Sequence, residues 1–272
     1  MEISMTALPA SGASAPKHEI ARDFGAASDT YESASRLQRL MGKAMLERLP
    51  VGRPDAKPLR ILDLGCGTGY FTRQLARRYP DARISAVDLS PGMIQYARAR
   101  ADGEVHWAQA DAERLPFADG TFDVVFSNLM LQWCDRPDQV FDECRRVLAR
   151  GGMLQCSTLL DGSLHELAQA WEKADPGRRH VNRFETRAAV TGHASARLPG
   201  ADVNTETVVL GYDSPLELIR ELKHLGAVYK GDDRRRTMTA PGRVRAMLEH
   251  YPRAPSGKVV ASYGACWISY GH

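Results

Sequence analysis

The sequence predicts an α/β fold, a doubly wound and mainly parallel sheet flanked by helices, and three observations carry this prediction. Between residues 59 and 158, short apolar runs alternate with helix-like segments. A glycine-rich turn, Asp63 to Gly69, joins the first apolar run to the helix-like segment after it. Acidic residues, Asp88 and Asp111, follow the next two runs. Alternation of this kind is typical of parallel sheets whose polar residues meet at one edge.

Composition is that of an ordinary globular protein. The chain has 272 residues, 43% hydrophobic and 25% charged, with a net charge of +3 that is too modest for a dedicated nucleic-acid binder. Its five cysteines lack C-x-x-C spacing, which argues against a zinc site or a disulfide framework and favours a cytoplasmic location. Residues 1–17 are expected to be a disordered tail rather than a secretory signal, and no apolar run approaches the ~18 residues of a membrane span.

The remaining residues, 18–272, are expected to form one domain. In 18–49, apolar residues recur at helical spacing with an interruption near 25–29, which predicts two helices with a bend. A proline-containing link, 51–58, leads from them into the first strand. The two helices are interpreted as a lid.

The elements of the core follow in order. Strands are expected at 59–64, 82–88, 104–109, 122–127 and 152–158. Helices are expected at 70–79, 91–101 and 136–149. Beyond them, a strand at 203–212, a helix at 215–225 beginning after Ser214, and a last strand at 258–270 are expected, with further helical segments at 164–173 and 184–198. Residues 160–183 and 214–250 are interpreted as insertions on the substrate side.

The glycine turn is suited to holding a small polar ligand. Glycines at 65, 67 and 69 allow positive φ and close approach of the backbone, and the new helix presents free N–H groups. The G-x-G-x-G spacing differs from the dinucleotide fingerprint G-x-G-x-x-G and from the P-loop.

The two acidic residues fit a nucleoside. Asp88 ends its strand 19 positions after Gly69 and can accept both ribose hydroxyls, while Asp111 could accept from an adenine amino group. Alternatively, Asp88 caps the helix that begins at Pro91, and Asp111 only starts a turn. Each alternative explains one residue, whereas the ordered set favours a nucleoside site.

Together, the glycine turn, Asp88 and Asp111 resemble those of the S-adenosylmethionine-dependent methyltransferases with a doubly wound, seven-stranded sheet, a Rossmann-like fold. The resemblance runs from about residue 19 to the C-terminus and implies S-adenosylmethionine as the cofactor. It assigns Asp63 and Gly65 to the methionine end, Asp88 to the ribose, Met93 to adenine packing, and Asp111 with Ala112 to the adenine edge. Gly67, Leu89 and Asn128 complete the implied binding set.

Four further segments narrow the family. Residues 20–25, Tyr31-Glu32, 128–133 and 180–184 are similar to the malonyl-acyl-carrier-protein O-methyltransferases of biotin synthesis. This resemblance implies methylation of the free carboxylate of a malonyl thioester, which primes pimeloyl synthesis, with an acyl carrier protein as partner. No metal is implied.

Such a reaction needs positioning more than a general base, because a carboxylic acid with a pKa of about 4 is ionised at neutral pH. Arg183 is the first candidate to hold the substrate carboxylate, through two parallel hydrogen bonds, and His180 is the second. Tyr31 is expected to close over the cofactor with Phe24, as part of the lid. A surface polar loop around 180–183, and core aromatics in place of lid aromatics, are the alternatives.

Other functions stay open. The same core would support methyl transfer to a free carboxylic acid or a quinone-like ring, or cofactor binding without transfer. A nucleobase amine is disfavoured, because residues 128–133 lack the Asn/Asp-Pro-Pro-aromatic element of enzymes that methylate such amines. Cys66 has no base paired with it in sequence and is expected to pack.

Basic runs could also steer an acidic carrier protein toward the pocket. They are Arg145-Arg146, Arg178-Arg179 and Arg234 to Arg236. Solvated helix faces are the simpler interpretation of such runs.

Overall fold

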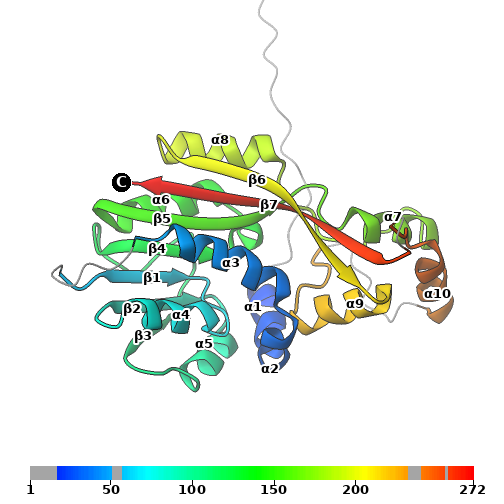
Figure 1. Cartoon of the computed structure of the whole chain (residues 1–272), viewed down its shortest axis with the longest axis horizontal. Helices are drawn as coiled ribbons and strands as arrows, with labels where there is room; N and C mark the ends of the chain where they lie inside the picture. The colour runs from blue at the N-terminus through cyan, green and yellow to red at the C-terminus, as the bar shows by residue number, and fades with distance from the viewer. Residues whose placement is uncertain (1–16, 51–56, 232–239, 255–256) are drawn as a thin grey trace, which may run out of the picture.

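A computed structural model describes residues 17–50, 57–231, 240–254 and 257–272, and its central feature is one seven-stranded sheet (Figure 1). The strand order is β3-β2-β1-β4-β5-β7-β6. β7 runs antiparallel to both of its neighbours, and the other adjacent pairs are parallel. The strands are β1 Arg60–Leu64, β2 Arg83–Asp88, β3 Val105–Gln109, β4 Phe122–Asn128, β5 Leu148–Leu160, β6 Asp202–Tyr212 and β7 Val259–Gly271. The predicted fold class is confirmed.

Helices cover both faces of the sheet because successive strand residues point to opposite sides. Ile61 of β1 packs in one apolar cluster with α3 (Arg36–Arg48) and α4 (Tyr70–Arg78). The next residue, Leu62, packs in a second cluster with α6 (Pro137–Val147) and α8 (Arg187–Arg197). The remaining helix of the parallel half is α5 (Pro91–Arg98).

A second group of helices gathers beyond the carboxyl ends of the parallel strands (Figure 1). It comprises α1 (Lys17–Ala26), α2 (Ser28–Tyr31), α7 (His165–Ala174), α9 (Pro215–His224) and α10 (Pro241–His250). Short 3₁₀ turns lie at Glu32–Ala34 and Leu131–Trp133. In Figure 1 the β1 arrow points toward α1 and α2, so the amino-terminal helices face the edge where the glycine turn lies.

Most predicted boundaries agree within about three residues, and one error has a clear cause. The helix expected at 136–149 ends at Val147, and Leu148 already has the extended ψ of 132°. Gly151, with φ of +77°, then turns the chain, and its N–H donates to the carbonyl of His272 at 2.8 Å. Leu148 pairs with Phe122 of β4, and this pairing begins β5 earlier than the apolar pattern indicates.

The amino-terminal segment is interrupted where predicted, since α1 ends at Ala26 and α2 begins at Ser28, but it forms three helices, α1, α2 and α3, where two were predicted. α1 begins at Lys17, one residue inside the predicted tail, and the rest of that tail lies outside the described residues, as does the Arg234 to Arg236 run. Ser214 caps α9, with its Oγ accepting from the Glu217 N–H at 3.3 Å. Within the described part of the chain, each helix is too short or too polar to cross a membrane.

Candidate functional site

The site lies between the ends of β1 and β4, where the strand order reverses. Open α/β sheets bind ligands at such a switch point. The backbone N–H groups of Gly65 and Cys66 both donate to the carbonyl of Val87, each at 2.9 Å, which holds the glycine turn against β2. Ser127 Oγ donates to the carbonyl of Leu64 at 2.9 Å and joins the end of β4 to β1.

The glycine turn needs its glycines for backbone conformation. Gly65, Gly67 and Gly69 have φ of +73°, +53° and +75°. A Cβ at Gly65 would lie 2.4 Å from Met130 Cγ, whereas a Cβ at Gly67 would meet nothing within 4 Å. The backbone at Gly67 therefore borders open space, as a turn that receives a ligand requires.

Asp88 organises this turn. Its Oδ2 accepts from the Gly67 N–H at 2.9 Å and its Oδ1 accepts from the Ser90 N–H at 2.8 Å. Burial raises the pKa of the Asp88 carboxyl, and these backbone N–H groups oppose the rise. The cap of α5 is Ser90, whose Oγ accepts from the Met93 N–H at 3.4 Å, so capping does not occupy Asp88.

Asp63 lies on the other side of the turn and is 2% exposed. Its Oδ2 accepts from Thr72 Oγ1 at 2.5 Å. Burial raises the pKa of Asp63 to about 7. The buried carboxyl can thus change its charge near neutral pH, in response to a cation placed beside it.

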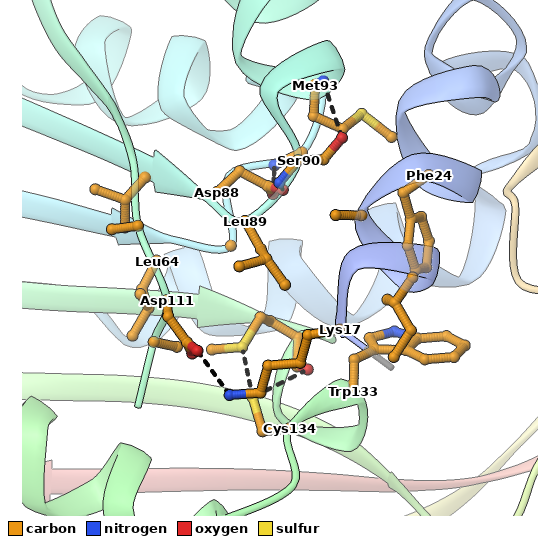
Figure 2. A pocket seen from close by; sticks show the side chains of 18 of the residues that line it. Lys17, Phe24, Leu64, Asp88, Leu89, Ser90, Met93, Asp111, Trp133 and Cys134 are labelled. Carbon is orange, nitrogen blue, oxygen red and sulfur yellow. Dashed lines mark hydrogen bonds and ion pairs between the residues drawn. The ribbon is translucent and has the colours of Figure 1, made fainter. Parts of the chain in front are cut away.

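Asp111 follows β3 and is contacted by the first helix. Lys17 Nζ lies 2.7 Å from Asp111 Oδ2 (Figure 2), and it also lies 2.7 Å from Glu113 Oε2. Asp111 Oδ1 accepts from the Glu113 N–H at 3.0 Å, so the carboxylate orders its own loop as well. An adenine amino group would share this carboxylate with Lys17.

Three neighbouring cavities open around these residues. The main cavity lies between α1 and the edge of the parallel strands, and it includes the predicted residues Gly65, Gly67, Asp88, Leu89, Met93, Asp111, Ala112 and Asn128. The glycine-loop cavity includes Asp63, Gly65, Gly67 and Asn128. Every residue predicted to bind the cofactor therefore lines one of these two adjoining cavities.

The apolar cavity lies beyond them, and Glu221 carries the only charged side chain among its described lining residues. Its aromatic residues come from distant segments and include Phe24, Trp133, Phe184 and Tyr263. The Phe24 and Trp133 rings meet edge to face, 5.1 Å between centroids (Figure 2). Tyr31 lines all three cavities, so the predicted lid residue lies where they meet.

The other two predicted positioning residues lie outside these linings. His180 stacks on Trp171 with ring centroids 3.9 Å apart, and its Nε2 lies 3.0 Å from Asp175 Oδ2. Arg183 is exposed, although its neighbours Asn182 and Phe184 line the apolar cavity. The structure therefore does not bring either side chain to the cavities, and direct binding of the substrate carboxylate by them stays a prediction.

Local strain marks the end of β4. Leu129 has φ of +53°, a conformation that costs a non-glycine residue of order 1–3 kcal/mol. Its N–H donates to Ser157, at 3.0 Å to Oγ and 3.1 Å to the carbonyl. Such strain clusters at functional sites, and here it places Leu129 in the walls of both the main and the apolar cavity.

The sequence does not single out Lys17 or Gln38, which both line these cavities. Lys17 was included in the polar tail, and the only signal for it was that the helical spacing begins at the next residues. Gln38 lies within a helix and has no local signature. Burial raises the pKa of the Cys66 thiol well above its usual value, which agrees with a packing role.

The fold and this site define the class of the protein. A reversed strand order, three glycines at positive φ, and carboxylates after β2 and β3 fit an adenosyl ligand with a charged end. The protein is a class I S-adenosylmethionine-dependent methyltransferase, and S-adenosylmethionine is its cofactor.

Comparisons with known proteins identify the family. Residues 62–156 match the model of the methyltransferase domain. Malonyl-[acyl-carrier protein] O-methyltransferase of Hahella chejuensis is 40% identical over 257 residues, which are 93% of this chain and 90% of the relative. The chain belongs to the family of malonyl-[acyl-carrier protein] O-methyltransferases.

Two further comparisons find similar chains in proteins with other or additional functions. The biotin biosynthesis bifunctional protein BioHC of Cellvibrio japonicus is 38% identical over 93% of this chain and 49% of that protein. The crystal structure of the [4+2]-cyclase SpnF has the same fold, with a TM-score of 0.59 and 19% identity, over 96% of this chain and 98% of that one. The fold is thus shared with a protein of different chemistry, and the acceptor side must decide the reaction.

Proposed function

We propose that this protein transfers a methyl group from S-adenosylmethionine to the free carboxylate of a malonyl group carried by an acyl carrier protein, for biotin synthesis. The observation that carries the proposal is the apolar cavity, which adjoins the glycine-loop cavity and contains no Lys, Arg or His among its described lining residues. An acceptor placed there meets the methionine end of the cofactor site. The names of the 34–40% identical relatives support the same acceptor.

The protein contributes to the reaction by positioning the substrate carboxylate and by excluding water from it. S-adenosylmethionine supplies an electrophilic methyl group when it is bound. A carboxylate is already ionised, so the protein needs no general base and must hold one oxygen in line with that methyl group. Excluding water from an apolar cavity strengthens the attraction between the anion and the cofactor's positive charge.

The lid provides this enclosure. One end of α1 is fastened by the Lys17 pair with Asp111 and Glu113, and the other by an ion pair between Asp23 and Lys230. Phe24 and Tyr31 then lie over the junction of the cavities, with ring centroids 6.4 Å apart. We infer that the segments 160–183 and 214–250 complete the substrate side, because Leu164, Asn182 and Leu222 line the apolar cavity.

The carrier protein would dock on the loop between α7 and α8. Arg178, Arg179 and Arg183 are exposed there, in the loop that contains Asn182 of the apolar cavity. Exposed positive charge beside a cavity mouth attracts an acidic partner and raises its association rate. Arg146 is engaged elsewhere, since it pairs with Glu143 at 2.7 Å and Asp119 at 2.8 Å. The free thiols support the cytoplasmic location in which carrier and cofactor would be met.

The proposal is tested by mass spectrometry of malonyl-carrier protein after incubation with the full chain and S-adenosylmethionine. One added methyl group on the acyl arm is expected, and acetyl-carrier protein, which lacks the free carboxylate, should stay unmodified. Malonyl-coenzyme A and free malonate are run in parallel. Turnover of free acids alone would overturn the proposal in favour of a small-molecule methyltransferase, and cofactor binding without turnover would indicate a binding protein.

A further inference from the structure

The apolar cavity has no Lys, Arg or His among its described lining residues to pair with a substrate carboxylate. Its neutral polar side chains must therefore orient that carboxylate. Three amide side chains line it, Gln38, Gln132 and Asn182. Gln132 Nε2 donates to the Leu129 carbonyl at 2.8 Å, and its Oε1 accepts from Thr158 Oγ1 at 3.2 Å.

The side-chain amide of Asn182 also has hydrogen-bond partners at both of its polar atoms. Asn182 Nδ2 donates to the Val228 carbonyl at 3.2 Å, and its Oδ1 accepts from the Lys230 N–H at 2.7 Å. The one charged side chain, Glu221, accepts from Tyr212 Oη at 2.7 Å and lies 3.6 Å from Arg36 Nη1. These groups are therefore occupied by the protein's own structure.

Gln38 is different. Its Oε1 is buried and has no hydrogen-bond partner among the described residues. Buried polar atoms are rarely left unpaired in native proteins, and an exception calls for an explanation such as a ligand. Because rotation about the last bond exchanges the amide oxygen and nitrogen, the same position can present an N–H donor.

The position of Gln38 is set by the sheet. Asn128 Nδ2, at the end of β4, donates to the backbone carbonyl of Gln38 at 3.0 Å. Asn128 Oδ1 accepts from Ser157 Oγ at 2.8 Å. The Gln38 side chain lines both the glycine-loop cavity and the apolar cavity, as Tyr31 does. It therefore lies where an acceptor would meet the methionine end of the cofactor site.

We propose that the side-chain amide of Gln38 donates a hydrogen bond to the substrate carboxylate and is a substrate-positioning residue of this enzyme. This assignment rests on the proposed function. A neutral donor suits the task, because it orients the carboxylate while withdrawing less charge from the attacking oxygen than a paired guanidinium would. The same reasoning replaces Arg183 as the group that would touch the carboxylate.

The test compares steady-state methylation of malonyl-carrier protein by the wild-type chain, Gln38→Leu and Gln38→Glu. Loss of a hydrogen bond to a charged group predicts a decrease in kcat/KM of about 10-fold to 100-fold for Gln38→Leu. The effect should appear mainly in KM, because the carboxylate is fully charged before the reaction. Affinity for S-adenosylhomocysteine, measured by calorimetry, should change less than about two-fold in both variants and shows that they are folded.

Gln38→Glu adds a pH signature that a structural role would not produce. Burial and the facing substrate carboxylate are expected to raise the pKa of the new carboxyl from its usual value of about 4.3. At pH 8 this variant should be less active than Gln38→Leu, since two carboxylates then face each other, and it should regain activity toward pH 6 as the new carboxyl is protonated and can donate. Gln139→Leu on α6 is the matched control, an exposed glutamine away from the cavities that should keep wild-type activity.

The outcomes separate the two proposals. A wild-type chain that does not methylate malonyl-carrier protein would overturn the proposed function and this assignment together. A wild-type chain that turns over, with Gln38→Leu within about two-fold of it and no pH-dependent recovery in Gln38→Glu, would overturn the assignment alone. If Gln38→Leu fails to bind S-adenosylhomocysteine, the pH profile of Gln38→Glu decides.

Discussion

The two sides of the site differ in the charge of the side chains that line them. The cofactor side, formed by the main and glycine-loop cavities, presents carboxylates at Asp63, Asp88 and Asp111 together with backbone groups of the glycine turn. The acceptor side, formed by the apolar cavity, presents aromatic and aliphatic side chains with three amides and one carboxylate, Glu221, which accepts from Tyr212 Oη. The cofactor side suits a cationic sulfonium. The acceptor side suits an anion that must stay nucleophilic.

The two sides also differ in how the chain builds them. The residues predicted to bind the cofactor lie between positions 63 and 128, at or near strand ends that one parallel sheet brings to a common edge. The acceptor side gathers residues from 24 to 263, and several of its segments are held by single contacts such as the hydrogen bond from Thr30 Oγ1 to the His224 carbonyl at 2.9 Å. The cofactor side thus follows mainly from the order of the parallel strands, and the acceptor side depends on contacts between distant segments.

The largest effect is expected on the cofactor side. Asp88→Ala removes a carboxylate that accepts from two backbone N–H groups and is predicted to bind the ribose, so affinity for S-adenosylhomocysteine should fall at least about 100-fold. Calorimetry measures this affinity, with Asp102→Ala, a side chain 78% exposed, as the control. Unchanged affinity would show that the turn does not depend on Asp88.

On the acceptor side, Tyr31→Phe should separate transfer from binding. Tyr31 lies at the junction of the cavities, and loss of its hydroxyl is expected to lower kcat about 10-fold while affinity for S-adenosylhomocysteine changes little. Tyr96→Phe on α5, outside the three cavities, is the control in the same methylation assay. Equal loss of cofactor affinity would place Tyr31 on the cofactor side instead.

The pH dependence of cofactor binding should reflect Asp63. Because burial raises its pKa to about 7, the carboxyl is mostly protonated at pH 6 and ionised at pH 8. If the ionised form binds the positively charged cofactor, affinity should rise up to about 10-fold over this interval. Asp63→Asn should abolish the rise, and a wild-type affinity that is flat or falls with pH would contradict the assignment.

The smallest effect is expected at the proposed carrier surface. The double variant Arg178→Glu with Arg179→Glu should raise KM for malonyl-carrier protein about three-fold to five-fold at low salt, with the difference shrinking at high salt. Arg150→Glu, exposed at the amino end of β5, is the control on the opposite edge of the sheet. An equal rise of KM in both would indicate general charge rather than a docking surface.

The carboxylates and glycines on the cofactor side could be predicted from the sequence. A glycine turn after one apolar run and acids after the next two predict neighbours in space, because parallel strands bring successive carboxyl ends to one edge. One boundary is wrong because a distant strand intervenes: Leu148 pairs with Phe122 of β4, so the helix ends before Leu148.

Tertiary structure alone decided the acceptor side. Arg183 and His180 carry the right chemistry in sequence, yet one is exposed and the other is stacked on Trp171. Gln38 has no local signature, and it becomes notable only because packing buries its Oε1 without a hydrogen-bond partner among the described residues. Long-range packing determines which polar groups are left unpaired, and no short stretch of sequence contains that information.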